Sequence, residues 1–188
     1  WRWRDWIVQS LNADKGYDRM IVEMLAADEV AADDDENLVA TGFIIRNFYR
    51  WNYNTWLKDN IEHTGKAFLG LTFNCCHCHD HKYDPISQKE FYQLYAFFNN
   101  FDGAPETVGA PRGGIQAPSI TLSASAENPA ASGRPAMGMK ERSTPKPTFI
   151  LIRGSYEHPG EKVERNTPAF LPPLKKKDGV YTRMDLAE

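Results

Sequence analysis

The chain has 188 residues, of which 41% are apolar and 12% aromatic, which is enough to bury one core and too few to require two. Its formal net charge of −3 argues against the basic surface that nucleic acids or anionic membranes attract. Its apolar runs are far shorter than the ~20 residues of a membrane-spanning helix. We therefore expect no nucleic-acid partner and no membrane insertion by this segment.

Helical periodicity dominates the first hundred residues. Apolar side chains recur at helical spacing before the Lys15-Gly16 break, and the same spacing resumes after it. The predicted helices cover residues 3–11, 17–25, 38–45 and 64–71. The best-marked helix follows Pro85, where Ser87 and Glu90 form a capping-box pattern ahead of an apolar face that ends at Phe98.

Beyond residue 102 the composition changes. Gly, Pro, Ala and Ser dominate residues 103–147 with almost no periodicity, which predicts a linker, and its length suggests that residues are missing from it. The β-branched run 148–152 predicts a strand, followed by an extended Pro-rich stretch and the solvated turn 175–177. We expect a mainly α fold: a helical domain over 1–102, the linker over 103–147, and an extended or β segment over 148–188.

The three cysteines, Cys75, Cys76 and Cys78, lie within four positions. No cysteine is left elsewhere to pair with them, so a disulfide framework is excluded and metal, cofactor or redox chemistry remains. Cys75, Cys78 and His79 form one Cys-x-x-Cys-His frame. Two thiols at this spacing can form thioethers with both vinyl groups of a haem, and the next histidine can bind the iron as proximal ligand. The frame predicts one covalent haem c.

The frame has three other interpretations. A zinc site would need a second ligand pair, and beyond the frame only histidines remain, namely His63, His77, His81 and His158. A thioredoxin-like pair would need a βαβ setting, whereas the flanks are predicted to be helical. Inert buried thiols are the third alternative. Haem is the favoured interpretation.

A second axial ligand would separate electron transfer from catalysis. The candidates are Met139, which would raise the iron potential, and His63 and His81. His81 follows the frame too closely to reach the opposite haem face and is expected to bond a propionate or backbone group. His63, beside Glu62, fits either a surface position or a distal acid–base role.

Further side chains near the frame have both a haem-related and an ordinary interpretation. Asp80 and Asp84 could accept the ring N–H of a ligating histidine, but an ordinary structural role is favoured for both, which for Asp84 is that of a turn residue before Pro85. Arg46 and Arg50 could pair with haem propionates or form a solvated face. Aromatic residues that could shield the porphyrin, bind a sugar or simply fill the core are Phe48, Tyr49, Trp51, Tyr53 and Trp56.

Blocks along nearly the whole chain carry a family resemblance. They are 17–18, 25–28, 40–43, 68–72, 78–88, 92–98, 147–148, 153–154, 159–160 and 168–173. With them the sequence resembles the large, exported, planctomycete-type cytochrome c proteins of unknown function. One departure is Cys76-His77, where relatives usually have a small residue and then a basic or polar one.

The resemblance implies export, haem attachment and a longer polypeptide with a further domain beyond Glu188. It also places a methionine near Met139. The abrupt start at Trp1 suggests that the natural N-terminus is missing as well. We expect periplasmic electron transfer with an unidentified redox partner protein and leave the oligomeric state open. The alternatives are an oxidative or peroxidase-like haem enzyme linked to polysaccharide breakdown, and an interaction module whose haem mainly staples the fold.

Overall fold

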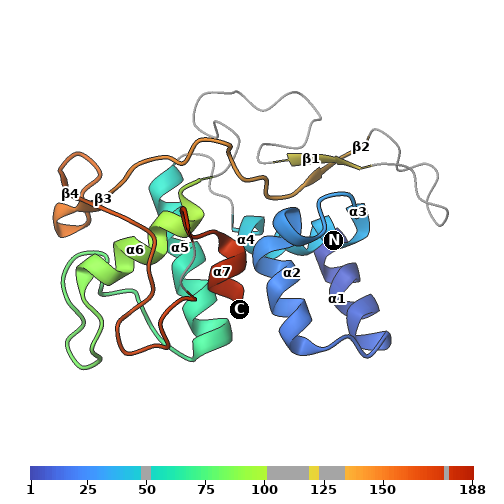
Figure 1. The fold of residues 1–188 in the computed structure, drawn as a ribbon, viewed down its shortest axis with the longest axis horizontal. Helices are drawn as coiled ribbons and strands as arrows, with labels where there is room; N and C mark the ends of the chain where they lie inside the picture. The colour runs from blue at the N-terminus through green and yellow to red at the C-terminus, as the bar shows by residue number, and fades with distance from the viewer. Residues whose placement is uncertain (48–51, 101–118, 123–133, 176–177) are drawn as a thin grey trace. The chain divides into compact units, whose positions relative to one another are not determined.

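The computed structural model describes residues 1–47, 52–100, 119–122, 134–175 and 178–188, and Figure 1 shows their elements. The fold is mainly α with a short β element, as predicted. The elements form two compact units, described separately below. Apart from the last two residues, the first unit comprises 1–51 and 101–142, and the second 52–100 and 143–186. The domain boundaries predicted at residues 102 and 147 stay predictions.

The first unit is built from short helices and one pair of strands. Its helices are α1 (Arg2–Asn12), α2 (Tyr17–Val30), α3 (Asp35–Leu38), η1 (Val39–Thr41) and α4 (Gly42–Ile45). The strands β1 (Ser119–Leu122) and β2 (Arg134–Met137) pair antiparallel, with Ser119 opposite Met137. The helices predicted over 3–11, 17–25 and 38–45 are confirmed, the last of them divided into short pieces. The two strands lie inside the segment for which the sequence predicts a linker.

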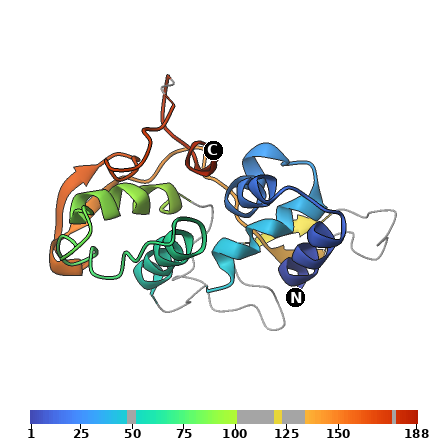
Figure 2. The same ribbon diagram turned by 90° about the horizontal axis from the view of Figure 1, so that it is seen from below.

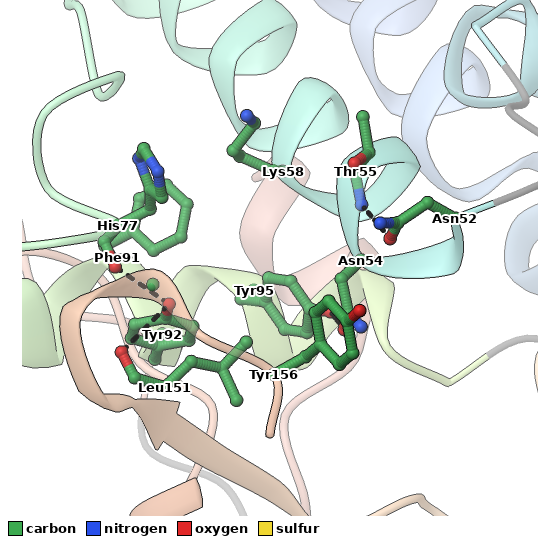
Figure 3. A pocket seen from close by; sticks show the side chains of 11 residues that line it. Asn52, Asn54, Thr55, Lys58, His77, Phe91, Tyr92, Tyr95, Leu151 and Tyr156 are labelled. Carbon is green, nitrogen blue, oxygen red and sulfur yellow. Dashed lines mark hydrogen bonds between the residues drawn. The ribbon is translucent and has the colours of Figure 1, made fainter. Parts of the chain in front are cut away.

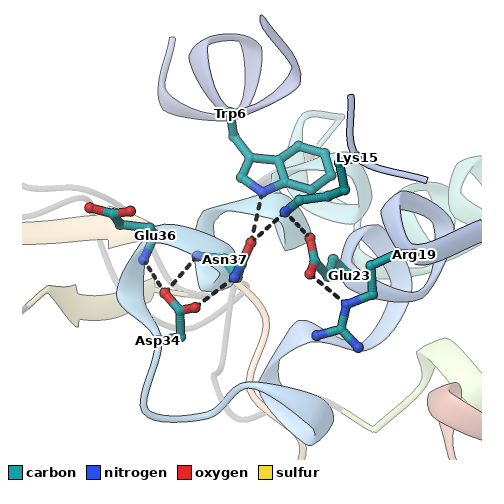
Figure 4. Close-up of polar contacts among 7 residues, drawn as sticks. All are labelled: Trp6, Lys15, Arg19, Glu23, Asp34, Glu36 and Asn37. Atoms are coloured by element: carbon teal, nitrogen blue, oxygen red, sulfur yellow. Dashed lines mark hydrogen bonds and ion pairs between the residues drawn. The ribbon is translucent and has the colours of Figure 1, made fainter. Parts of the chain in front are cut away.

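The core of the first unit contains a buried carboxylate that pairs with two basic side chains (Figure 4). Glu23 on α2 is 2% exposed, and its two oxygens lie 2.6 Å from Lys15 Nζ and 2.7 Å from Arg19 Nε. The side-chain oxygen of Asn37 accepts hydrogen bonds from Lys15 Nζ and from Trp6 Nε1. Both carboxylate oxygens are therefore satisfied, which allows a charged group to lie inside an otherwise apolar core.

The second unit packs two helices against a small hairpin. Its elements are α5 (Tyr53–Thr64), the π-helical turn η2 (Gly65–Leu69), α6 (Gln88–Phe98), β3 (Thr148–Leu151), η4 (Ile152–Gly154), β4 (Pro159–Val163) and α7 (Arg183–Ala187). Figures 1 and 2 show α6 beside α5 and along the β3–β4 pair. The predicted strand at 148–152 is confirmed as β3, which ends one residue earlier.

The start of α6 is fixed by the predicted capping box. The Ser87 hydroxyl accepts from the Glu90 amide, and the Glu90 carboxylate accepts from the Ser87 amide at 2.7 Å. These two bonds satisfy amides that the first helical turn cannot pair internally. From this fixed start the helix buries Phe91, Tyr92 and Leu94 in the core of the unit.

Residues 53–71 differ from the sequence prediction. A twelve-residue helix, α5, occupies an aromatic stretch in which the sequence pattern indicates no helix. The short helix predicted at 64–71 is instead a π-helical turn that continues α5 and ends at Gly70, whose φ is +66°. In the described part of the chain, no helix combines the length and the apolar character needed to cross a membrane.

Candidate functional site

The three cysteines lie on one tight turn between η2 and α6. The carbonyl oxygen of Cys75 accepts hydrogen bonds from the amides of Cys78 at 3.2 Å and His79 at 3.3 Å. These bonds close a single helical turn over the Cys-x-x-Cys-His frame. Cys75 is exposed and Cys78 is half-buried, so both cysteines of the frame are at least partly accessible.

Cys76 faces the interior instead. Its side chain is fully buried, and its sulfur lies 3.8 Å from the carbonyl oxygen of Ile86. Burial, reinforced by the nearby negative charge of Cys75, raises the pKa of the Cys76 thiol to about 11. A protonated, covered thiol is a poor nucleophile. The turn therefore separates two accessible thiols from one inert thiol.

His79 is exposed and its ring is oriented by the backbone. Its Nδ1 lies 2.7 Å from the carbonyl oxygen of Asp80, which can accept only when Nδ1 carries the proton. That tautomer leaves the lone pair on Nε2, the arrangement commonly found in histidines that bind metals. The carbonyl of Asp80, not its carboxylate, makes this contact. The carboxylate instead accepts from the Gln88 amide at the start of α6.

His77 joins the turn to α6. Its Nδ1 lies 2.5 Å from the carbonyl oxygen of Asn74, and its own carbonyl accepts from Tyr92 Oη at 2.9 Å and Gln88 Nε2 at 3.1 Å. Tyr92 is buried, and burial raises the pKa of its phenol, with a smaller contribution from the charge of Cys78. Two side chains of one helix thus fix the middle of the turn.

Asn74, the first residue of the cysteine turn, is held by a side chain of α5. Glu62 is 5% exposed and lies 2.8 Å from Lys66 Nζ. With the Asn74 amide oriented to satisfy both residues, its nitrogen donates to the Glu62 carboxylate. The turn is therefore clamped between α5 and α6, which keeps the orientation of its three cysteines fixed.

Residues after the frame serve the loop that leads to α6. His81 Nδ1 accepts from the Asp84 amide at 2.9 Å and lies 3.1 Å from the Asp84 carboxylate. His81 and Asp84 therefore act as turn residues here, in line with the roles favoured for them from the sequence.

The remaining candidates lie on other elements. His63 is half-buried on the last turn of α5. Met139 and Arg46 belong to the first unit: Met139 is buried with its amide donating to Thr41 Oγ1, and Arg46 lies over the Phe43 ring. Met139 as a haem ligand stays a prediction. Phe48, Tyr49, Arg50 and Trp51 lie outside the described residues.

The cysteine turn carries the groups that covalent attachment of haem uses. It offers two accessible thiols three residues apart and an imidazole whose Nε2 keeps its lone pair. Within the described ranges, no group of three or more His, Cys, Asp or Glu side chains is arranged to hold a metal ion.

Fold and site define a mainly helical protein that presents two accessible thiols and an exposed histidine on one turn of its second unit. The chain belongs to PSCyt2, a protein family of unknown function (DUF1549), whose model matches residues 1–103, more than half of its length. Comparison with curated proteins and with solved structures found no match. The matched residues include Cys75, Cys78 and His79 of the frame. A link between this family and cytochrome c remains a prediction.

Proposed function

We propose that the chain binds one haem c covalently through Cys75 and Cys78, with His79 as the proximal ligand of the iron. The observation that supports this most is the sorting of the thiols: the two cysteines of the frame are accessible, and the third is buried. The backbone bond of His79 Nδ1 adds a second, independent support.

The attachment reaction needs no reagent other than the thiols of the protein and the vinyl groups of the haem. Cys75 and Cys78 would each add across one vinyl group, the sulfur bonding to one carbon and the thiol hydrogen passing to the other, so that no oxidant is consumed. Cys76 would stay out of this reaction because its sulfur is covered. Tyr92 and Gln88 would hold the turn in place through the carbonyl of His77.

The function that we propose is electron transfer outside the cytoplasm, with an unidentified protein as redox partner. A bound haem supplies an iron that changes valence without a change in the protein's covalent structure. Cys75, His79 and Asp80 are exposed, so a partner could approach this edge of the second unit. Export is part of the proposal, since cytochrome-type attachment implies maturation in the periplasm.

A spectroscopic experiment tests the proposal. The chain would be produced with an export signal beside a haem-attachment system, and its visible spectrum recorded in the oxidised and reduced forms with small mediators. We expect a c-type reduced spectrum and rapid, reversible exchange of electrons. Absence of haem would contradict the attachment, whereas stable haem with negligible exchange would contradict electron transfer and favour a structural role.

The same sample tests whether Met139 occupies the sixth coordination position of the iron. If Met139 binds the iron, the reduced wild-type protein excludes carbon monoxide and Met139→Ala admits it. If carbon monoxide binds the wild type readily and Met139→Ala changes nothing, the methionine has no such role. In that case Met139 is simply a buried residue of the first unit.

A further inference from the structure

A pocket of about 190 Å³ lies beside the cysteine turn, entirely within the second unit (Figure 3). It is bounded by the beginning of α5, by α6, by the η4 turn and by His77. Its volume is below the roughly 300–1,000 Å³ of sites for drug-sized molecules. The pocket therefore suits a ligand of a single ring.

The pocket walls are largely aromatic. Phe91 and Tyr95 on α6 and Tyr156 after η4 line it, together with the side chain of Leu151. Figure 3 shows Tyr95 and Tyr156 among the side chains that line the pocket. Aromatic faces of this kind favour a flat, apolar ring between them.

Two asparagines at the pocket offer hydrogen-bond donors. The side-chain oxygen of Asn52 already accepts from the Thr55 amide at 3.1 Å, and that of Asn54 accepts from Tyr95 Oη at 2.7 Å. Each asparagine is left with its NH₂ group to offer to a ligand. A ligand that matches two amide donors must carry hydrogen-bond acceptors.

The pocket also carries uncompensated positive charge. Lys58 on α5 is half-buried and lines it, and among the described residues no acidic side chain does so. None of the ion pairs found in the described ranges includes Lys58. A partly desolvated ammonium group without a carboxylate partner favours an anion over a neutral molecule.

We propose that this pocket binds a small aromatic carboxylate, with its ring against the aromatic lining and its carboxylate toward Lys58 and the two asparagine amides. A neutral sugar would also stack on the aromatic rings but would leave Lys58 without a partner. Binding of this kind involves only side chains of this chain and does not depend on haem attachment.

The pocket lies next to the proposed attachment site. Gly154 lines it with a φ of +76°, and a Cβ atom at this position would lie 2.8 Å from His77 Cδ2 and 2.9 Å from Cys78 Sγ. Gly154 therefore packs directly on the turn that carries Cys78. A ligand bound here would be close to whatever group Cys78 carries.

Calorimetric titration of the purified protein with benzoate, benzamide and glucose tests the proposal. Benzoate and benzamide share a ring and differ in charge, so we expect benzoate to bind about tenfold more tightly. Tighter binding of glucose or benzamide than of benzoate would overturn the proposal, as would the absence of benzoate binding. The Soret band is recorded in parallel, because a carboxylate that bound a haem iron would shift it.

Two variants and one control assign the binding to this pocket. Lys58→Met should weaken benzoate binding about five- to tenfold and leave benzamide unchanged, since it removes only the charge. Tyr156 is 59% exposed, so its replacement should not disturb folding. Tyr156→Ala should weaken the binding of both benzoate and benzamide. Lys89→Met, which removes an exposed lysine paired with Glu161 outside the pocket, should change neither. Equal effects of Lys58→Met and Lys89→Met, or a Soret shift that persists in Lys58→Met, would contradict the assignment.

Discussion

The sulfur of Cys76 lies 3.8 Å from the carbonyl oxygen of Ile86, on the buried side of a turn whose other two cysteines are at least partly accessible. This contact distinguishes one buried cysteine from two that are less buried. The two less buried residues, Cys75 and Cys78, have the spacing that two vinyl groups would require. If the frame attaches haem as we propose, the burial of Cys76 keeps that thiol out of the reaction.

The first prediction concerns the three cysteine positions. Cys75→Ser and Cys78→Ser should each remove one thioether and lower the yield of protein with covalent haem several-fold, while Cys76→Ser should retain it. The measurement is the haem stain of a denaturing gel, normalised to protein. Equal loss in all three variants would mean that the buried thiol takes part in attachment.

The second prediction follows from the raised pKa of Cys76. In the unfolded chain this thiol ionises near pH 9, but in the folded chain only near pH 11. Between these values the unfolded state loses the proton first, so the free energy of unfolding falls by roughly 2 to 3 kcal/mol as the pH rises from 9 to 11.

Cys76→Ala provides the comparison. Denaturant unfolding of the haem-free protein at several pH values should show a shallower decline above pH 9 in this variant than in the wild type. Identical pH profiles would mean that Cys76 is not buried in solution. Below pH 9 the two proteins should differ only by a constant offset from the lost packing.

The third prediction compares two glycines with positive φ. Gly70 has φ +66° and nothing near the place that a Cβ atom would occupy, so Gly70→Ala should cost about 1 kcal/mol from backbone strain alone. Gly154→Ala adds a clash with the His77 ring and the Cys78 sulfur and should cost clearly more. Thermal unfolding of both variants checks this. Equal melting temperatures would indicate that the η4 turn does not pack on the cysteine turn.

The fourth prediction concerns the buried carboxylate of the first unit. Lys15→Met or Arg19→Met alone should cost about 1 kcal/mol, because the other cation still pairs with Glu23. The double variant leaves Glu23 buried without a cation and should cost more than the sum.

The control for this comparison of single and double variants is Arg4→Met, since Arg4 is 72% exposed and pairs with the exposed Asp5. It should change the free energy of unfolding by less than about 0.5 kcal/mol. Strict additivity of Lys15→Met and Arg19→Met in denaturant unfolding would argue that Glu23 reaches water.

Local signals explain which elements could be predicted from the sequence. The capping box of Ser87 and Glu90 defines α6 because its hydrogen bonds form between residues three apart. The strand pair β1–β2 could not be predicted in the same way. Its two strands are separated by a stretch of low complexity, and pairing between distant segments leaves no local periodicity.

The candidate site likewise combines features that the sequence predicts with features that depend on distant residues. The Cys-x-x-Cys-His spacing is a local property and could be predicted, but the burial of Cys76 depends on the carbonyl of Ile86, ten residues away. The pocket beside the turn combines side chains from residues 52 to 156. Because these residues come from segments far apart in the sequence, no local pattern could have predicted the pocket.

The most direct test of the central claim is mass spectrometry of the proteolytic peptide that contains residues 75–79, after alkylation of free thiols. We expect one haem mass on this peptide, linked through Cys75 and Cys78, with Cys76 as its single alkylated cysteine. Three alkylated cysteines without haem, or haem that extracts into acid acetone, would contradict covalent attachment through the frame.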